Sequence, residues 1–265
     1  PYADGFNHQH GHAAELEAMF YYAALADKTY PWLAESYEYN EDATECTIYI
    51  RKGIQWSDGE PFTANDVAFT YDYLKQHAPE LRDSAFVDGA VESVEAIDDY
   101  TVKFMLKEPS WRFHFSHCTF RFDRGIYLVP KHIWEDVEAP LEFTHYDVEK
   151  GYPVVTGPYQ ITRFEPQVKH FDRRYEWWAY DIGLIDHMPE VERLVNIGFS
   201  GEEVAAQMII NGEVDVSLDL RPATIEAILN QAEHVISFTG KEKPYGYVDW
   251  WPISMYFNSL DPPYD

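Results

Sequence analysis

The chain has little cysteine and little positive charge, and both shortages exclude classes of protein. Of its 265 residues only two are cysteines, Cys46 and Cys118. Their spacing fits no metal-ligand motif, so they either form one disulfide or remain two buried thiols. Twenty Lys and Arg residues stand against 46 Asp and Glu residues, which gives a formal net charge of −26. Because this charge repels phosphate backbones and anionic lipids, we expect no nucleic-acid partner and no basic membrane-binding surface.

Long apolar runs and common catalytic motifs are also missing. No stretch approaches the ~20 consecutive apolar residues that a helix needs to span a bilayer. The chain opens at Pro1 without the pattern of a signal peptide, which indicates a mature form or an internal portion. It contains no G-x-S-x-G, P-loop, G-x-G-x-x-G or H-E-x-x-H pattern. Nothing in the sequence therefore demands catalysis or a cofactor.

Aromatic residues, by contrast, are abundant. They make up 17% of the chain, with 8 Trp, 20 Tyr and 16 Phe. Indole faces stack on sugar rings and on apolar peptide side chains, so this composition favours an aromatic-lined binding surface. Two pairs of adjacent tryptophans, Trp177–Trp178 and Trp250–Trp251, are of special interest. Neighbours on a strand point to opposite faces, so we expect one of each pair to be buried while the other faces a cleft.

Three histidines near the start of the chain, His8, His10 and His12, alternate with other residues. In an extended segment they would share one face, and imidazoles at that spacing can bind Zn, Cu or Ni. No Cys or carboxylate stands at a convincing spacing beside them. The segment is therefore open to three interpretations: a metal site, a ligand contact, or a polar loop that leads into a helix over about 13–24.

The hydrophobic pattern predicts a mixed α/β fold with short strands. Alternation predicts half-buried strands over 44–51 and 100–106, and Thr63 reads as the N-cap of an amphipathic helix over 64–76. Further strands are predicted over 159–164, 168–173, 191–199 and 253–257. Ser200 and Glu203 form the pattern of a capping box for a helix through Ile210. After Asn211–Gly212 the pattern predicts a strand over 214–220 and then a helix that begins near Pro222.

Several segments, taken together and in order, resemble a known family. They are Pro31–Glu38, Thr47–Val67, Val129–His132, Thr156–Tyr159, Arg174–Trp178, Asn211–Asp215, Phe257–Asn258 and Pro262–Asp265. This pattern is similar to that of the family 5 extracellular solute-binding proteins, the oligopeptide and dipeptide receptors of ABC importers. The stretch from Arg174 departs from the family's R-N-x-x-Y-W pattern at its start.

The resemblance implies a particular architecture. The fold would be the mixed α/β lobe I of a type II periplasmic-binding-protein-like fold. Residues 1–30 and 150–265 would form a discontinuous ligand-binding subdomain, and residues 31–149 would form an inserted subdomain. Because family members are roughly twice as long, we expect this chain to be an N-terminal portion that lacks the second lobe.

The resemblance also implies a function without chemistry on the ligand. The protein would be a monomer that captures oligopeptides and delivers them to the membrane permease of an ABC importer. It would work in the periplasm or at the cell surface, where a lipid anchor can hold it. The positions carried forward as ligand contacts are Asn7, His8, Gln9, His10, Asp219, Trp250, Trp251, Ser254 and Tyr256.

Two alternative ligands remain open within the same family. The segment between Gly5 and Ala14 contains no Asp or Glu to hold a peptide's amino terminus. Its histidines and amides, with the several tryptophans, suit an oligosaccharide. A minority alternative is a nickel or metal-chelate receptor that uses His8, His10 and His12. A glycoside-cleaving enzyme is remote, because among 46 carboxylates some pair always looks suitable.

Overall fold

The structure is a computed structural model that describes residues 12–121, 125–198, 201–217 and 220–246. The chain divides into two compact units, residues 1–197 and residues 198–265. This division does not test the subdomain boundaries that the family resemblance implies, so those boundaries stay a prediction. None of the helices in the described ranges is long and apolar enough to cross a membrane.

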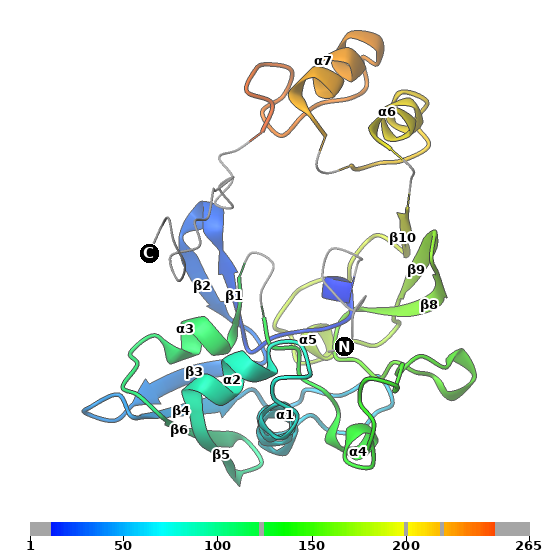
Figure 1. The fold of residues 1–265 in the computed structure, drawn as a ribbon. Helices are drawn as coiled ribbons and strands as arrows, with labels where there is room; N and C mark the ends of the chain where they lie inside the picture. The colour runs from blue at the N-terminus through cyan, green and yellow to red at the C-terminus, as the bar shows by residue number, and fades with distance from the viewer. Residues whose placement is uncertain (1–11, 122–124, 199–200, 218–219, 247–265) are drawn as a thin grey trace, which may run out of the picture. The chain divides into compact units, whose positions relative to one another are not determined.

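In its described residues, the first unit contains three small β-sheets together with several helices (Figure 1). The largest is antiparallel, with the order β3 (Ala34–Tyr39), β4 (Glu45–Ile50), β6 (Thr101–Leu106), β5 (Val91–Asp98). The second has the order β2 (Lys28–Pro31), β1 (Phe20–Ala23), β7 (Thr119–Phe120). The third has the order β10 (Arg193–Ile197), β9 (Val168–Arg173), β8 (Tyr159–Glu165).

The helices of the first unit are α1 (Ala64–Gln76), α2 (Ser84–Ala90), α3 (Phe113–His117), α4 (Lys131–Trp134) and α5 (Trp178–Asp181). Single 3₁₀ turns lie at His12–Ala14, Ala24–Ala26 and Val148–Lys150. The mixed α/β fold predicted from the sequence is confirmed.

The helix α1 begins where its capping residues require. The Thr63 side chain accepts a hydrogen bond from the Asn65 backbone N–H at 3.2 Å, and Asp66 accepts one from the Thr63 backbone N–H at 2.8 Å. These bonds satisfy backbone donors that a helix start otherwise leaves unpaired. The second oxygen of Asp66 accepts from the backbone N–H of Lys131 at 2.9 Å. The same carboxylate therefore ties α1 to the start of α4.

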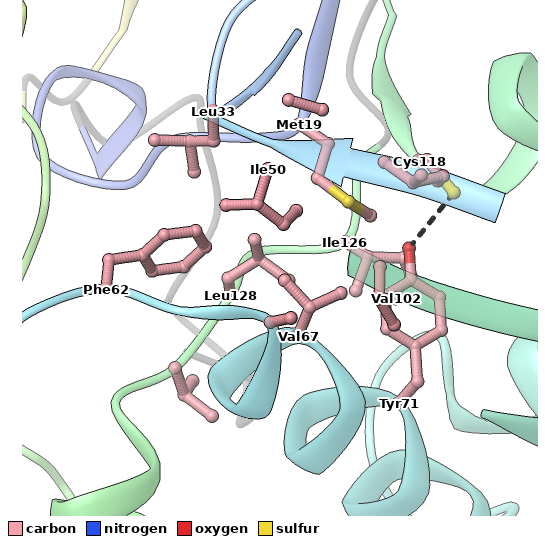
Figure 2. Close-up of a cluster of buried hydrophobic side chains, with 14 of the residues drawn as sticks. Met19, Leu33, Ile50, Phe62, Val67, Tyr71, Val102, Cys118, Ile126 and Leu128 are labelled. Atoms are coloured by element: carbon pink, nitrogen blue, oxygen red, sulfur yellow. Dashed lines mark hydrogen bonds between the residues drawn. The ribbon is translucent and has the colours of Figure 1, made fainter. Parts of the chain in front are cut away.

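The main hydrophobic core lies between α1 and the largest sheet (Figure 2). Strand β4 buries alternate residues, and β6 does the same, as their sequence patterns predict. Apolar side chains from strands, helix and loops meet there, among them Met19, Leu33, Ile50, Phe62, Val67, Tyr71, Val102, Ile126 and Leu128. Cys46 and Cys118 belong to this core as free buried thiols, and the Tyr71 hydroxyl lies 3.6 Å from the Cys118 sulfur. Of the two possibilities left open by the sequence, the structure has the buried thiols.

The predicted helix over 13–24 is wrong. The chain forms only a 3₁₀ turn at His12–Ala14 and then runs to the strand β1. Tertiary pairing explains the difference: β1 pairs antiparallel with β2 and parallel with β7. The Glu15 carbonyl also accepts a hydrogen bond from the Gly157 N–H at 3.0 Å, and its carboxylate accepts one from the Ile161 N–H at 3.0 Å. Backbone N–H groups distant in sequence thus bond to this segment, in place of the internal hydrogen bonds of a helix.

In the second unit, α6 (Glu202–Ile210) and α7 (Pro222–Gln231) pack together. The capping box predicted at Ser200 and Glu203 is not seen, because Gly201 occupies the N-cap position of α6, and Ser200 lies outside the described residues. The φ of Gly201 is 116°, a backbone conformation that glycine adopts without strain. The predicted strand over 214–220 is wrong in its described part, since residues 213–217 form no strand and Val216 is 78% exposed. Two predictions are confirmed: Gly212, with φ 70°, follows α6, and Pro222 opens α7.

Candidate functional site

All nine predicted ligand contacts lie outside the residues that the structure describes. They are Asn7, His8, Gln9, His10, Asp219, Trp250, Trp251, Ser254 and Tyr256. Their contribution to a site stays a prediction, as does the strand over 253–257. The metal alternative is in the same position, because His8 and His10 lie outside the described ranges. Within those ranges no group of three or more His, Cys, Asp or Glu side chains is placed to hold a metal ion.

The described residues of the first unit do form a groove of about 580 Å³ that was not predicted. Three segments supply its walls: the start of the described chain, the β1–β2 hairpin with the residue after it, and residues 158–184. Its lining consists of Ala13, Ala14, Glu17, Tyr21, Tyr30, Pro31, Trp32, Pro158, Tyr159, Trp177 and Leu184. Five of these residues are aromatic and only one is charged. The groove can therefore accept a flat ring or an apolar side chain, with tyrosine hydroxyls for polar contacts.

The single charged residue of the lining, Glu17, is almost completely buried, with 5% of its surface exposed. One carboxylate oxygen accepts a hydrogen bond from the Trp32 indole N–H, and the other accepts one from the Trp178 indole N–H, both at 2.8 Å. Burial raises the pKa of Glu17, and the two indole hydrogen bonds oppose this shift. The carboxylate thus links an aromatic residue of the groove wall to the first residue of α5.

The aromatic side chains beside Glu17 pack edge to face or at a tilt. The Trp32 ring lies 5.4 Å from that of Trp178 and 6.0 Å from those of Trp177 and Tyr21, measured between centroids. Trp177 and Trp178 are both buried, but only Trp177 lines the groove, so one of the pair faces a cleft as the sequence predicted. The argument from strand alternation is wrong, because Trp178 starts a helix and the pair is not on a strand.

The turn Thr156–Tyr159 contributes Pro158 and Tyr159 to the groove wall. Gly157 approaches the N-terminal segment so closely that a Cβ atom there would lie 2.6 Å from the Glu15 carbonyl oxygen. The Arg174 guanidinium holds the turn from the other side and donates to the Gly157 carbonyl at 2.9 Å. Only glycine permits this contact between the two segments. The family-like motif at Thr156–Tyr159 therefore contains a glycine that the fold requires for steric reasons.

A second hollow, of about 570 Å³, is lined by residues of one loop, Gly183 to Pro189. The loop carries an exposed ion pair between Asp186 and His187. Since, among the described residues, only this loop lines the hollow, it offers fewer means of holding a ligand than the aromatic groove. The groove is therefore the candidate site.

Comparison of the sequence with known proteins gives consistent relatives. The probable peptide-binding protein YejA of Agrobacterium fabrum is 27% identical over 191 residues, which cover 71% of this chain and 30% of the relative. The dipeptide-binding protein of Escherichia coli is 26% identical over 181 residues, which cover 62% of this chain and 31% of the relative. The chain thus spans about a third of the length of these curated relatives.

Solved structures agree with the sequence relatives. A periplasmic oligopeptide-binding protein of Thermotoga maritima, solved with mannohexaose bound, superposes with a TM-score of 0.68 at 29% identity. The match covers 87% of this chain and 40% of the Thermotoga protein. A sequence profile of bacterial extracellular solute-binding proteins, family 5 middle, matches residues 28–265. The chain therefore belongs to the bacterial extracellular solute-binding proteins of family 5.

Proposed function

We propose that the protein captures oligopeptides outside the cytoplasm and hands them to the membrane permease of an ABC importer. The observation that carries this proposal is the groove, whose aromatic walls suit the side chain of a bound peptide. The names of the Agrobacterium and Escherichia relatives support a peptide as the ligand. The groove's lining offers stacking and burial without a nucleophile beside a base, so we propose binding without chemistry.

An oligosaccharide is the second candidate ligand. The specific support is the Thermotoga structure, in which a protein described as oligopeptide-binding holds mannohexaose. Aromatic faces with hydroxyl groups at their edges bind pyranose rings as readily as they bind apolar side chains. The groove's chemistry accommodates both ligands, and binding of defined probes distinguishes them.

Indole signals in a nitrogen-15 NMR spectrum test the proposal directly. The probes are Ala-Trp-Ala, tri-alanine and mannohexaose, each added to the labelled chain up to millimolar concentration. We expect Ala-Trp-Ala to shift the signals of Trp32 and Trp177, and tri-alanine to shift them less. NMR detects weak complexes, which matters because the chain spans only part of its relatives.

Two variants assign the shifts to the groove. Trp32→Ala should abolish the response to Ala-Trp-Ala. Trp111→Ala is the matched control, because Trp111 is 61% exposed and lies outside the groove. A response to mannohexaose alone would mean that the ligand is an oligosaccharide and not a peptide. No response to any probe, or one that only Trp111→Ala removes, would contradict the proposed site.

A further inference from the structure

The groove wall at Trp32 is fixed through its backbone, and its side chain is held by aromatic packing and by one hydrogen bond. The Trp32 N–H donates to the Met19 carbonyl at 3.0 Å, and the Trp32 carbonyl accepts from the Arg51 side chain at 2.8 Å. The indole itself is only partly buried, at the edge of the groove. Ring packing restricts the position of this indole, and a hydrogen bond to its N–H adds a constraint on its direction.

The Glu17 carboxylate supplies that constraint. It lies between two indole donors at equal distances of 2.8 Å, and one of them, Trp178, is 98% buried in the interior. Hydrogen bonds to a charged acceptor are stronger than those between neutral groups. Since each oxygen of Glu17 already accepts an indole hydrogen bond, we assign no direct ligand contact to its carboxylate.

We infer that Glu17 is a positioning residue, which anchors the Trp32 indole to Trp178 and so keeps the groove open for a flat ring. The class of ligand follows from the walls: a group with an aromatic or pyranose ring stacks on Trp32, whereas a small aliphatic group gains little. The identity of the ligand rests on the proposed function, but the anchoring of the indole does not.

The substitution Glu17→Gln separates the positioning role of Glu17 from simple space filling. Glu17→Gln preserves size and shape, but the amide presents one acceptor and one donor group where the carboxylate presents two acceptors. The two indole N–H groups then compete for one oxygen. Glu15→Gln is the matched control, because Glu15 is a buried acid two residues away that bonds to the Ile161 backbone and does not line the groove.

The first readout needs no ligand. The chain has eight tryptophans and hence eight indole signals. We expect Glu17→Gln to move those of Trp32 and Trp178 most, and Glu15→Gln to leave these two in place. If Glu17→Gln does not fold, Trp178→Phe serves instead, and the Trp32 signal should move because the two indoles share one carboxylate. Unmoved signals would overturn the inference whether or not the protein binds a ligand.

The second readout is affinity for Ala-Trp-Ala and mannohexaose in a double-mutant cycle. We expect Glu17→Gln to weaken binding of the responding probe about tenfold in the wild-type background. In a Trp32→Phe background the same change should have no further effect, because the anchored donor is already gone. Equal losses in both backgrounds would mean that Glu17 acts independently of Trp32, against the inference. Failure of every probe to bind, with the indole signals moved as expected, would instead count against the proposed function alone.

Discussion

His117 shows how a single buried residue can set the pH response of the fold. Its ring stacks between Phe86, with a centroid distance of 4.0 Å, and Phe113, at 4.9 Å. Neither ring nitrogen makes a hydrogen bond of normal geometry in the described part of the structure. Burial lowers the pKa of His117 to about 4. In the native state the ring therefore stays neutral down to about pH 4, whereas in the unfolded chain it already binds a proton near pH 6.5.

The sign of the pH dependence follows from this difference. An unfolded histidine has a pKa near 6.5, so between pH 6.5 and 4 the unfolded state binds more protons and stability falls on acidification. We predict that His117→Phe makes the protein less acid-sensitive. From pH 7.5 to pH 5 the variant should lose about 2 kcal/mol less of its free energy of unfolding than the wild type. Urea unfolding at both pH values measures this, and equal losses would contradict the prediction.

Residue patterns in the sequence located some of these side chains and missed others. Asp66 was predictable in the first turn of α1, because its cap partner Thr63 is three residues away. Its hydrogen bond to Lys131 was not, because nothing local signals a partner 65 positions along the chain. Glu17 escaped for the same reason: its indole donors come from residues 15 and 161 positions away. The one available signal was an acidic residue within an apolar run, Leu16 to Phe20.

At the scale of elements, prediction succeeded where the forces are local. The bounds of α1 follow from its cap and its apolar face, and the strands predicted over 159–164 and 168–173 are the paired strands β8 and β9. Prediction failed where contacts with residues distant in sequence determine the secondary structure. The segment after His12 has a helical pattern but pairs with β2 and β7 instead. Residues 213–217 alternate like a strand, yet an alternating segment becomes a strand only with a hydrogen-bonding neighbour, and the described residues provide none.

The close contact between the N-terminal segment and the turn at Gly157 is an element-level feature with a clear test. A Cβ at Gly157 would meet backbone atoms of Glu15 and Ala14 at 2.6–2.8 Å, so the two segments must separate. Overpacking of this kind costs about 1–3 kcal/mol, and we predict a loss in that range for Gly157→Ala. Thermal or urea unfolding gives the value.

Gly89 in α2 is the matched control for this substitution. No atom lies within 4 Å of a Cβ placed there, and alanine favours a helix over glycine. Gly89→Ala should therefore be neutral or stabilise by up to about 1 kcal/mol. Because Ala13, Ala14 and Pro158 line the groove beside the contact, Gly157→Ala should also move the indole signal of Trp32. A fully stable Gly157→Ala variant with an unchanged spectrum would contradict the predicted contact.

At the scale of the whole molecule, the sequence predicted the family and the fold class but not the groove. The family is readable because its motifs run through nearly the whole chain in order, and the profile match over residues 28–265 confirms it. The groove is built from residues within 13–32 and residues within 158–184, which are far apart in sequence, so no local pattern outlines it. The abundance of aromatic residues indicated an aromatic binding surface, but not which tryptophans would form it.

The net charge of −26 is a property of the whole chain, and it should oppose the compact state. Folding brings like charges together, and at ~0.01 M salt they interact over ~30 Å, against ~10 Å at 0.1 M. Added salt also weakens surface ion pairs such as Arg193–Asp172, but such pairs contribute only about 0–1 kcal/mol each. The excess of negative charge should therefore dominate, and the melting temperature should rise with ionic strength.

Comparing salts separates screening from specific binding. Screening depends on ionic strength alone, so sodium, potassium and choline chloride should raise the melting temperature equally when matched in ionic strength. A rise with only one cation would reveal a bound ion in place of general screening. A fall with all three would mean that the attractive ion pairs outweigh the repulsion among the 46 acidic residues, and the charge argument would be wrong.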